Sequence, residues 1–481
     1  MIGAPSLEIA VVVLGLVVLM VEAFATKLNR ETLAWTGIIG LAAVFAATFF
    51  LAPAPAAEAT GFWSFYAADS LAIFFKRFAL VTTILVLIMM VDYAPIVRQS
   101  IHGATAQAGL GEFFAIPLFT CAGLMWMASA VDFVMIFVSL ELVTMSFYVL
   151  VAFTRRNPAT LEAGVKYLIL SALSTGFLVY GITWIFGVTG ETNLARITAA
   201  LGAAEVERVP ALFGMALVLV ALGFKIAAVP FQIWVPDVYQ GAPTPVTAYL
   251  SVGSKAAGFV VLLRVLEPFF IMPQMQKLLV VMAILTLIYG NVAALPQTNL
   301  KRLLAYSSIG HAGYLLIGVV SFAGEAVSFY LVSYLLMTML SFAVLVVVAN
   351  QTGDEIADFN GLAKRAPLLS FAMLLSMASL AGIPFTAGFL GKFFIFDAAV
   401  RQQQMALVVV GVITVACGFY YYFKVIRAMY WEAPTRTDAI LLSQASRVTM
   451  IALMAAIFVL GVYPQPILNA LRPSPVAAAV R

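Results

Sequence analysis

Six ionisable side chains lie in otherwise apolar stretches of the sequence, each in a different stretch. They are Glu141, Lys166, Lys225, Lys255, His311 and Lys392. A charged side chain at the centre of a membrane costs at least about 2.5–3.5 kcal/mol, so ionisable groups there usually serve ion or proton transport. One group cannot cross a hydrocarbon core of about 30 Å, whereas several groups joined by water can pass protons along. The set therefore predicts proton transfer.

Lys225 and Lys392 stand close to prolines that must interrupt their helices. Lys225 lies five residues before Pro230, and Lys392 lies eight residues after Pro384. Broken helices in a membrane are tolerated only where the freed backbone is buried in protein or lines a wet cavity. The sequences around the two prolines, AVPF and GIPF, are alike and five predicted spans apart. An odd number of spans reverses the orientation, so the pair predicts an inverted repeat.

Glu141 is the expected partner of Lys225. Burial disfavours the charged form of a lysine, and a nearby carboxylate favours it. At an effective dielectric constant of about 20, moving the carboxylate from about 10 to about 5 Å changes the interaction by about 1.7 kcal/mol. That change is large enough to bias proton loading against release. Two interpretations remain open at this point, a switching pair and a static ion pair that holds two helices together.

The other polar side chains in the apolar stretches have simpler interpretations. His311 is the only histidine within a predicted span, where it either titrates near neutral pH or is a hydrogen-bonded core residue. Lys76 and Arg77 fall early in their span and Lys424 falls late in its own, so these three are predicted to extend to the membrane interface.

Composition places the whole chain in a membrane. Of its 481 residues, 63% are apolar and 10% are charged, against about 25% charged in soluble domains. The mean hydropathy is +1.06. The net charge of +4 comes from scattered basic residues and does not indicate nucleic-acid binding. Cys121 and Cys417 lie in separate apolar spans without a metal-binding spacing, so no metal site is predicted.

At about 20 apolar residues per span, the sequence predicts an all-α polytopic membrane protein with about 14 transmembrane helices. The predicted spans are 7–26, 31–52, 69–91, 112–130, 133–153, 161–187, 209–230, 246–266, 274–295, 303–321, 325–349, 367–396, 405–429 and 447–470. The first span has no basic residues before it and is too long for a cleaved signal, so we expect it to be retained. The loops after odd-numbered spans carry more Lys and Arg, which predicts that both termini face away from the cytoplasm. The short loop at 236–246 is predicted to fold back against helix ends.

The stretches that carry the candidate residues resemble the antiporter-like membrane subunits of respiratory complex I. The matching runs are FVSLELVTMSFYVLVA (137–152), LEAGVKYLILSALSTGFLVYGITWIFGVTG (161–190), GFKIAAVPFQIWVPDVYQGAPTPV (223–246), LPQTNLKRLLAYSSIGHAGYLLIG (295–318) and GIPFTAGFLGKFF (382–394). Within the family the chain is most similar to the subunit N branch. Subunit L continues into a long lateral helix, which we do not expect here, and subunit M carries glutamate where this chain has Lys392.

The resemblance implies two inverted five-helix repeats, at spans 4–8 and 9–13, each containing a broken helix. The implied division is 1–111 for three N-terminal helices, 112–266 and 267–429 for the two repeats, and 430–481 for a C-terminal helix and tail. It also implies roles for the candidate residues: Glu141 matches the helix-5 glutamate of the family, and Lys392 matches the helix-12 lysine towards the outer face. Lys166, Lys225 and Lys255 match the lysines of helices 6, 7 and 8.

The implied function is proton translocation as a subunit of NADH:quinone oxidoreductase in a bacterial inner membrane. The expected partners are other membrane subunits of complex I, including neighbouring antiporter-like subunits, and the lipid bilayer. We expect no cofactor on this chain, because NADH, FMN, iron–sulfur clusters and quinone are used by other subunits. The alternatives are a subunit of a multisubunit sodium/proton antiporter, which shares the Glu and Lys motifs, and a structural spacer, which the retained lysines disfavour.

Overall fold

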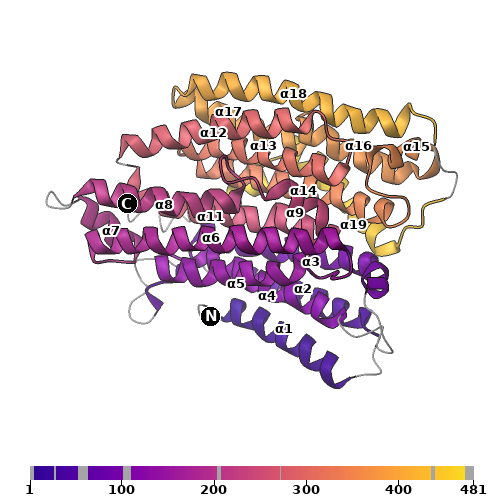
Figure 1. Ribbon diagram of the computed structural model, residues 1–481, viewed down its shortest axis with the longest axis horizontal. Helices are drawn as coiled ribbons and strands as arrows, with labels where there is room; N and C mark the ends of the chain where they lie inside the picture. Colours follow the sequence, from indigo (N-terminus) through magenta and orange to yellow (C-terminus); the bar gives the residue numbers. More distant parts are fainter. Residues whose placement is uncertain are drawn as a thin grey trace.

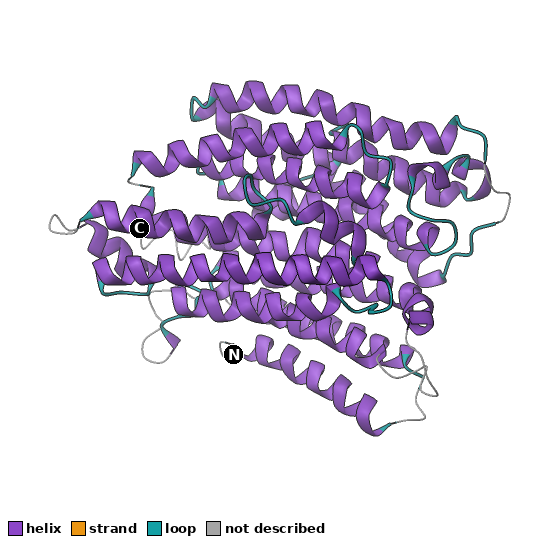
Figure 2. Ribbon diagram, viewed as in Figure 1, coloured by secondary structure: helices purple, strands orange, loops and turns teal. Residues whose placement is uncertain are grey.

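The computed structural model describes residues 5–25, 29–51, 63–100, 110–202, 207–270, 272–434 and 439–471. Long helices run side by side through most of this part of the chain and form one bundle (Figure 1). The described residues contain no strand, only loops and turns between helices (Figure 2). The predicted all-α architecture is confirmed.

Thirteen helical segments among the described residues are long and apolar enough to cross a membrane. They are α1 (Ser6–Phe24), α2 with its 3-10 extension (Glu31–Phe50), α3 (Ser70–Ser100), α4 (Leu110–Ser129), α5 (Phe133–Val151), α6 (Pro158–Thr189), α8 (Arg208–Ile226), the continuous segment Thr244–Phe269, α12 (Pro273–Ala294), α13 (Leu300–Val320), α14 (Gly324–Ala349), α18 (Met405–Tyr430) and α19 (Gln444–Val462). The continuous segment Thr244–Phe269 consists of α10 (Thr244–Tyr249), a π-helical turn η4 (Leu250–Ser254), α11 (Lys255–Leu266) and a final 3-10 turn η5 (Glu267–Phe269).

The remaining predicted span, 367–396, is a broken helix made of α16 (Pro367–Ala381) and α17 (Ala387–Arg401). The end of α16 has the same backbone geometry as the end of α8. The short helix α9 (Val235–Gly241) follows α8. Ala227 and Gly382 both have positive φ, 65° and 92°. In both places the second residue after the helix donates to a carbonyl five positions back, Ala228 to Gly223 and Ile383 to Ala378. This is the Schellman ending, so both breaks use the same local geometry.

Three boundaries differ from the sequence prediction. α8 stops at Ile226, four residues before Pro230, because the chain turns at Ala227. The segment 236–246 is largely helical, in α9 and the start of α10, because its prolines lie in the first turns, where a missing N–H costs nothing. The last span ends at Val462 just before Pro464, and a separate short helix, α20 (Gln465–Leu471), follows it.

The centre of the bundle is formed by three segments whose most apolar stretches are each 94% buried, Thr244–Phe269, α13 and α14. By contrast, only 28% of the most apolar stretch of α1 and of α6 is buried, and α1 lies at the edge of the bundle in Figure 1. Two short helices complete the described fold, α7 (Leu194–Gly202) and α15 (Leu362–Arg365). Lys255 and His311 belong to the enclosed segments, so the fold places them far from lipid.

A close approach of α12 and α13 fixes the position of the central helix. A methyl group added at Gly290 of α12 would collide with the backbone of Gly310 on α13. We predict that Gly290→Ala lowers the unfolding free energy by about 1–3 kcal/mol, the usual cost of overpacking a tight contact. The unfolding midpoint of the purified protein measures this. Gly176→Ala on α6 is the matched control, because no heavy atom lies within 4 Å of its added methyl group; an equal midpoint for the two variants would contradict the prediction.

Candidate functional site

Lys225 lies in the last turn of α8 and is 4% exposed. Its Nζ donates to the hydroxyl of Thr144 on α5 at 2.9 Å. Glu141, one turn before Thr144 on the same helix, accepts instead from the hydroxyl of Thr175 on α6 at 2.7 Å. Among the described residues no ion pair within 4 Å joins Lys225 to Glu141. The static pair considered from the sequence is therefore not formed here, because Lys225 contacts α5 through Thr144 and not through Glu141.

Lys255 begins α11 directly after the π-helical turn and is 1% exposed. Its Nζ donates to both the carbonyl and the hydroxyl oxygen of Ser308 on α13. The same Nζ lies 5.6 Å from the ring centre of Tyr334. Ser251 in the π-helical turn shares a hydrogen bond of 2.8 Å with the Tyr334 hydroxyl. Single π turns inside helices are frequent at functional sites, and this one precedes the most enclosed lysine of the predicted set.

His311 joins three helices through two tyrosine hydroxyls. Its Nδ1 lies 2.7 Å from the Tyr330 hydroxyl on α14, and its Nε2 lies 3.0 Å from the Tyr422 hydroxyl on α18. The Tyr422 hydroxyl is also hydrogen-bonded to Ser307 on α13. A neutral imidazole donates through one nitrogen and accepts through the other. His311 is thus a hydrogen-bonded core histidine whose partners can themselves give and take protons.

Lys392 on α17 fills the break that precedes its own helix. Its Nζ donates to the carbonyls of Leu380 and Ala381 at 2.7 and 2.9 Å, the last residues of α16. The ring of Tyr314 on α13 lies 5.1 Å away. Lys392 also lines a cavity of about 390 Å³ together with Phe389, Phe396 and other residues of α17 and α18. The lysine therefore contacts freed backbone on one side and open space on the other.

The central helix α13 connects Lys255 to Lys392. Ser308, His311 and Tyr314 follow one another at intervals of three residues, so they lie on one side of α13. The sequence prediction did not include the tyrosines that complete this line. They are Tyr314, Tyr330, Tyr334 and Tyr422, all of them buried. The available signal was tyrosine in strongly apolar helices, because a buried hydroxyl needs a partner.

Lys166 does not join this interior line. Its side chain is 39% exposed and forms ion pairs with Glu162 and Asp237, each at 2.7 Å. Arg302 of α13 pairs with the other oxygen of Asp237 at 2.8 Å. Lys166 therefore belongs to a charged cluster at the edge of the bundle. Asp237 was the only charge in the segment 236–246, and this was the signal for its role.

The charge of Asp237 is set by this cluster. Burial alone raises the pKa of its carboxyl, but the hydrogen bonds and charges of Lys166 and Arg302 outweigh burial and leave the pKa below its ordinary value. Asp237 is therefore an anion between two cations that reach it from α6 and α13.

Lys76, Arg77 and Lys424 were predicted to extend to the membrane interface, and the structure places them differently from one another. Arg77 donates to the Thr48 hydroxyl and carbonyl, both at 3.0 Å, near the end of α2. Lys424 is part-buried and donates to the carbonyl of Gln297 at 2.8 Å. Lys76 is the exception, because it is 1% exposed and pairs with Glu8 on α1 at 2.9 Å. The prediction that Lys76 extends to the interface is wrong; a carboxylate from the first helix keeps the ammonium inside.

A family model described as NADH:quinone oxidoreductase/Mrp antiporter, TM, matches residues 130–418. This segment contains all six candidate residues and both helix breaks. The chain belongs to this family. The resemblance predicted from the sequence is confirmed.

Curated relatives extend the match over nearly the whole chain. NADH-quinone oxidoreductase subunit N of Desulforamulus reducens is 40% identical over 96% of this chain and 95% of that protein. Subunit N of Trichlorobacter lovleyi is 41% identical over 88% of this chain and 86% of that protein. The similarity to the subunit N branch is thus confirmed.

Solved structures agree. A chain of respiratory complex I from Thermus thermophilus with bound aureothin has a TM-score of 0.80 at 31% identity, covering 97% of this chain and 99% of that one. A chain of the Mrp complex from Dietzia sp. has a TM-score of 0.83 at 22% identity, covering 97% and 96%. The second match shows that the fold is common to both branches of the family.

A tryptophan side chain stabilises the backbone at the break after α8. Trp234 donates its Nε1–H to the carbonyl of Phe224, next to Lys225, at 3.1 Å. We predict that Trp234→Phe lowers the unfolding free energy by about 1–3 kcal/mol, because a buried polar group loses a partner. Thermal unfolding of the purified protein measures the loss. Trp184→Phe is the control, since that indole is 36% exposed; a larger loss in the control would refute the assignment.

The Asp237 cluster predicts a pH dependence. Because its folded pKa is lowered, its contribution is present above the unfolded carboxyl pKa of about 3.9 and is lost as the pH falls through the folded pKa. We expect Asp237→Asn to reduce stability at neutral pH by less than about 1 kcal/mol, since the pair is about one-third exposed. The difference from the wild type should shrink towards pH 3. Unfolding midpoints at several pH values test this, with Asp397→Asn, from an exposed pair with Arg401, as control; a constant difference would contradict it.

Proposed function

We propose that this chain is the proton-translocating subunit N of a bacterial NADH:quinone oxidoreductase. Protons move through Glu141, Lys166, Lys225, Lys255, His311 and Lys392, and quinone reduction elsewhere in the complex drives them. The observation that carries the proposal is the buried line on α13, which connects Lys255 through Ser308 and His311 towards Lys392. The chain thereby serves a translocase without performing redox chemistry itself.

The chemistry of this line supports proton transfer. Serine, tyrosine and neutral histidine each both donate and accept hydrogen bonds, so a proton can enter at one atom and leave from another. Lys225, Lys255 and Lys392 have no carboxylate within 4 Å among the described residues, and a buried ammonium without a counter-charge is costly. Such lysines are suited to taking up and releasing protons rather than to holding them.

The two breaks support the division into repeats. α8 and α16 end in the same hydrogen-bond pattern, and each break has a lysine beside it. We assign residues 112–266 and 267–429 to two inverted five-helix repeats, preceded by 1–111 and followed by 430–481. Each repeat would form half of the proton path, and Lys392 would be its exchange site towards the outer face.

The exposed side of α5 supports a neighbouring subunit as partner. Glu141 is half-buried near the middle of α5, between the outward-facing Val138 and Met145, which are 53% and 61% exposed. A carboxylate facing lipid at that depth is unfavourable. We therefore place another membrane subunit of complex I against this side. On this proposal NADH, FMN, iron–sulfur clusters and quinone are bound by other subunits, and this chain binds no cofactor.

The orientation follows from the helix count and the loop charges. With the thirteen candidate spans and the broken helix α16–α17 counted as a fourteenth crossing, the start of α1 and the end of α19 would lie at the same face of the membrane. Lys and Arg are more frequent in the loops at the other face, which the positive-inside rule assigns to the cytoplasm. Both termini would thus lie on the periplasmic side of the inner membrane.

A sodium/proton antiporter subunit is the second candidate, favoured by the shared fold with the Mrp complex. The higher identity to subunit N relatives favours the oxidoreductase. Purification of the native complex separates them. Co-migration of this chain with NADH:quinone reductase activity supports the first function, and migration apart from that activity refutes it.

The proposed proton relay predicts the effect of neutralising Lys225 and Glu141. Lys225→Met and Glu141→Gln keep the side-chain size while removing the charge that would load or bias the proton. We expect both to lower proton uptake and coupled quinone reduction in inverted membrane vesicles. Lys277→Met, an exposed lysine near the start of α12, should leave both rates unchanged. Full proton uptake per NADH in both relay variants would sink the proposal.

A further inference from the structure

A second group of buried charges lies outside the two repeats, where α1 and α3 begin. Glu8 on α1 and Lys76 on α3 are 0% and 1% exposed, and their charged atoms lie 2.9 Å apart. The Tyr66 hydroxyl donates to Glu8 Oε1 at 3.0 Å and accepts from Lys76 Nζ at 2.5 Å. Lys76, Tyr66 and Glu8 are thus joined to one another by one ion pair and two hydrogen bonds, and we call these three residues the outer cluster.

One buried oxygen of the outer cluster lacks a hydrogen-bond partner among the described residues. Glu8 Oε1 accepts a hydrogen bond from Tyr66 and forms the ion pair with Lys76, whereas the buried Glu8 Oε2 has no hydrogen-bond partner in the described part of the chain. A buried carboxylate that serves only as a structural anchor is normally satisfied on both oxygens. The free Oε2 is a position where a proton or a water molecule can bind.

Tyr66 is held rigidly in place. Backbone hydrogen bonds join Ala67 to Ser129 and Val131 to Phe65, on either side of it. Its ring packs edge-on against Trp126 at 5.7 Å, and Lys76 Nζ lies 4.7 Å from the ring centre. The hydroxyl is therefore fixed between the ammonium and the carboxylate, the arrangement that a proton carrier requires.

Asp69 connects the outer cluster to the surface of the chain. It pairs with Arg264 at 2.8 Å, and its side chain is 33% exposed. Burial raises the pKa of its carboxyl, but the charge of Arg264 and, more weakly, that of Lys76 outweigh burial and leave the pKa below its usual value. Asp69 lies directly before α3 and seven residues, about two helical turns, before Lys76, so the two side chains lie on the same side of α3. Arg264 belongs to α11, the helix that begins with Lys255.

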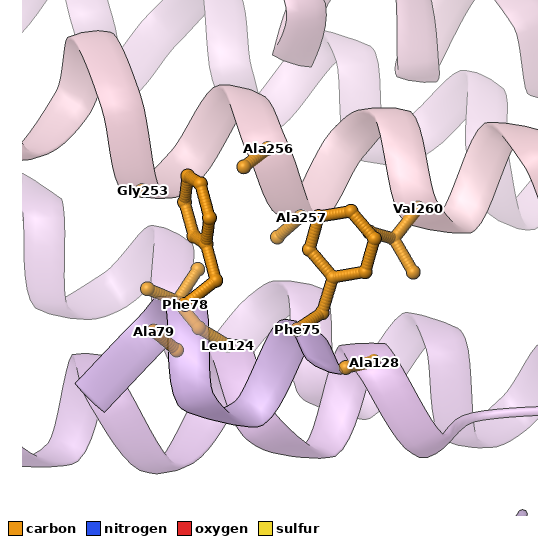
Figure 3. A pocket seen from close by; sticks show the side chains of 9 residues that line it. All are labelled: Phe75, Phe78, Ala79, Leu124, Ala128, Gly253, Ala256, Ala257 and Val260. Atoms are coloured by element: carbon orange, nitrogen blue, oxygen red, sulfur yellow. The ribbon is translucent and has the colours of Figure 1, made fainter. Parts of the chain in front are cut away.

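On the inward side of α3, the described residues leave only a small cavity of about 10 Å³ between α3, α4 and α11. It is lined by apolar residues, which include Phe75, Phe78 and Val260. Figure 3 shows only carbon atoms on the side chains around it. Apolar cavities of this size stay dry. Phe75 faces this cavity while the next residue, Lys76, faces α1, so α3 keeps the outer cluster apart from the interior line.

We propose that Glu8, Lys76 and Tyr66 form an additional proton-binding site of this subunit, open to the outer face through Asp69. The Lys76 ammonium passes a proton to the Tyr66 oxygen while Tyr66 passes its own proton to Glu8, so the ion pair becomes an amine and a carboxylic acid without a change in net charge. The amine then takes a second proton from the side of Asp69, and the reverse steps release it. The inference rests on the proposed proton-translocating function.

The test separates a proton site from a static ion pair. In the complete complex in inverted vesicles, Glu8→Gln or Lys76→Met alone should reduce the amount of assembled complex, because each leaves one buried charge unpaired. The double variant removes both charges, so assembly should recover. We expect its proton uptake per NADH oxidised to remain below that of the wild type. A wild-type ratio in the assembled double variant would overturn the proposal.

Tyr66→Phe provides the second variant. It keeps the ring against Trp126 and the Glu8–Lys76 pair but removes the hydroxyl that passes the proton, so the same loss of uptake per NADH is expected at normal assembly. A wild-type ratio here also refutes the proposal. Arg77→Met changes the neighbouring cation outside the cluster and should keep the wild-type ratio. Lys225→Met in the same assay separates the proposed function of the chain from the proposed role of the outer cluster. If Lys225→Met lowers proton uptake per NADH while the outer-cluster variants keep the wild-type ratio, only the proposal for the outer cluster is refuted.

Discussion

A helix that stops inside a membrane leaves carbonyl groups that water cannot reach, and each must find a donor within the protein. The interior of this chain is organised around that constraint. At the end of α16, the ammonium of Lys392 supplies the donors for Leu380 and Ala381. The break and the lysine therefore explain one another, since the lysine satisfies the backbone and the freed backbone gives the lysine polar partners in an apolar region.

The break after α8 meets the same constraint with other donors. The indole of Trp234 reaches the carbonyl of Phe224, and the amide of Val229 donates to the hydroxyl of Thr286 on α12. Lys225 is consequently not needed to close its own break and extends across to Thr144 on α5, one turn from Glu141. The two breaks share a backbone pattern, but only the break after α8 leaves its lysine, Lys225, free to respond to a carboxylate on another helix.

The features that could be predicted from the sequence are those that depend on a local residue pattern. The lengths of the apolar runs predicted the thirteen long helices of the described part of the chain and the broken helix α16–α17, and the prolines indicated both breaks to within a few residues. Lys225, Lys255, His311 and Lys392 were identified because a charge in an apolar run is conspicuous. The tyrosines around His311 were missed, since tyrosine resembles a core residue until its partner on a distant helix is known. Lys76 was assigned to the interface for the same reason, because Glu8 lies in a helix two crossings earlier.

The buried lysines differ in what surrounds them. Lys76 faces a carboxylate, so a proton that leaves its ammonium has an acceptor within the same cluster and the net charge is kept. Lys255 and Lys392 each donate two hydrogen bonds to neutral oxygens. An ammonium has three N–H donors and a neutral amine has two. Both lysines can therefore lose a proton and still satisfy the same oxygens, so the surrounding helices need not move when the charge does.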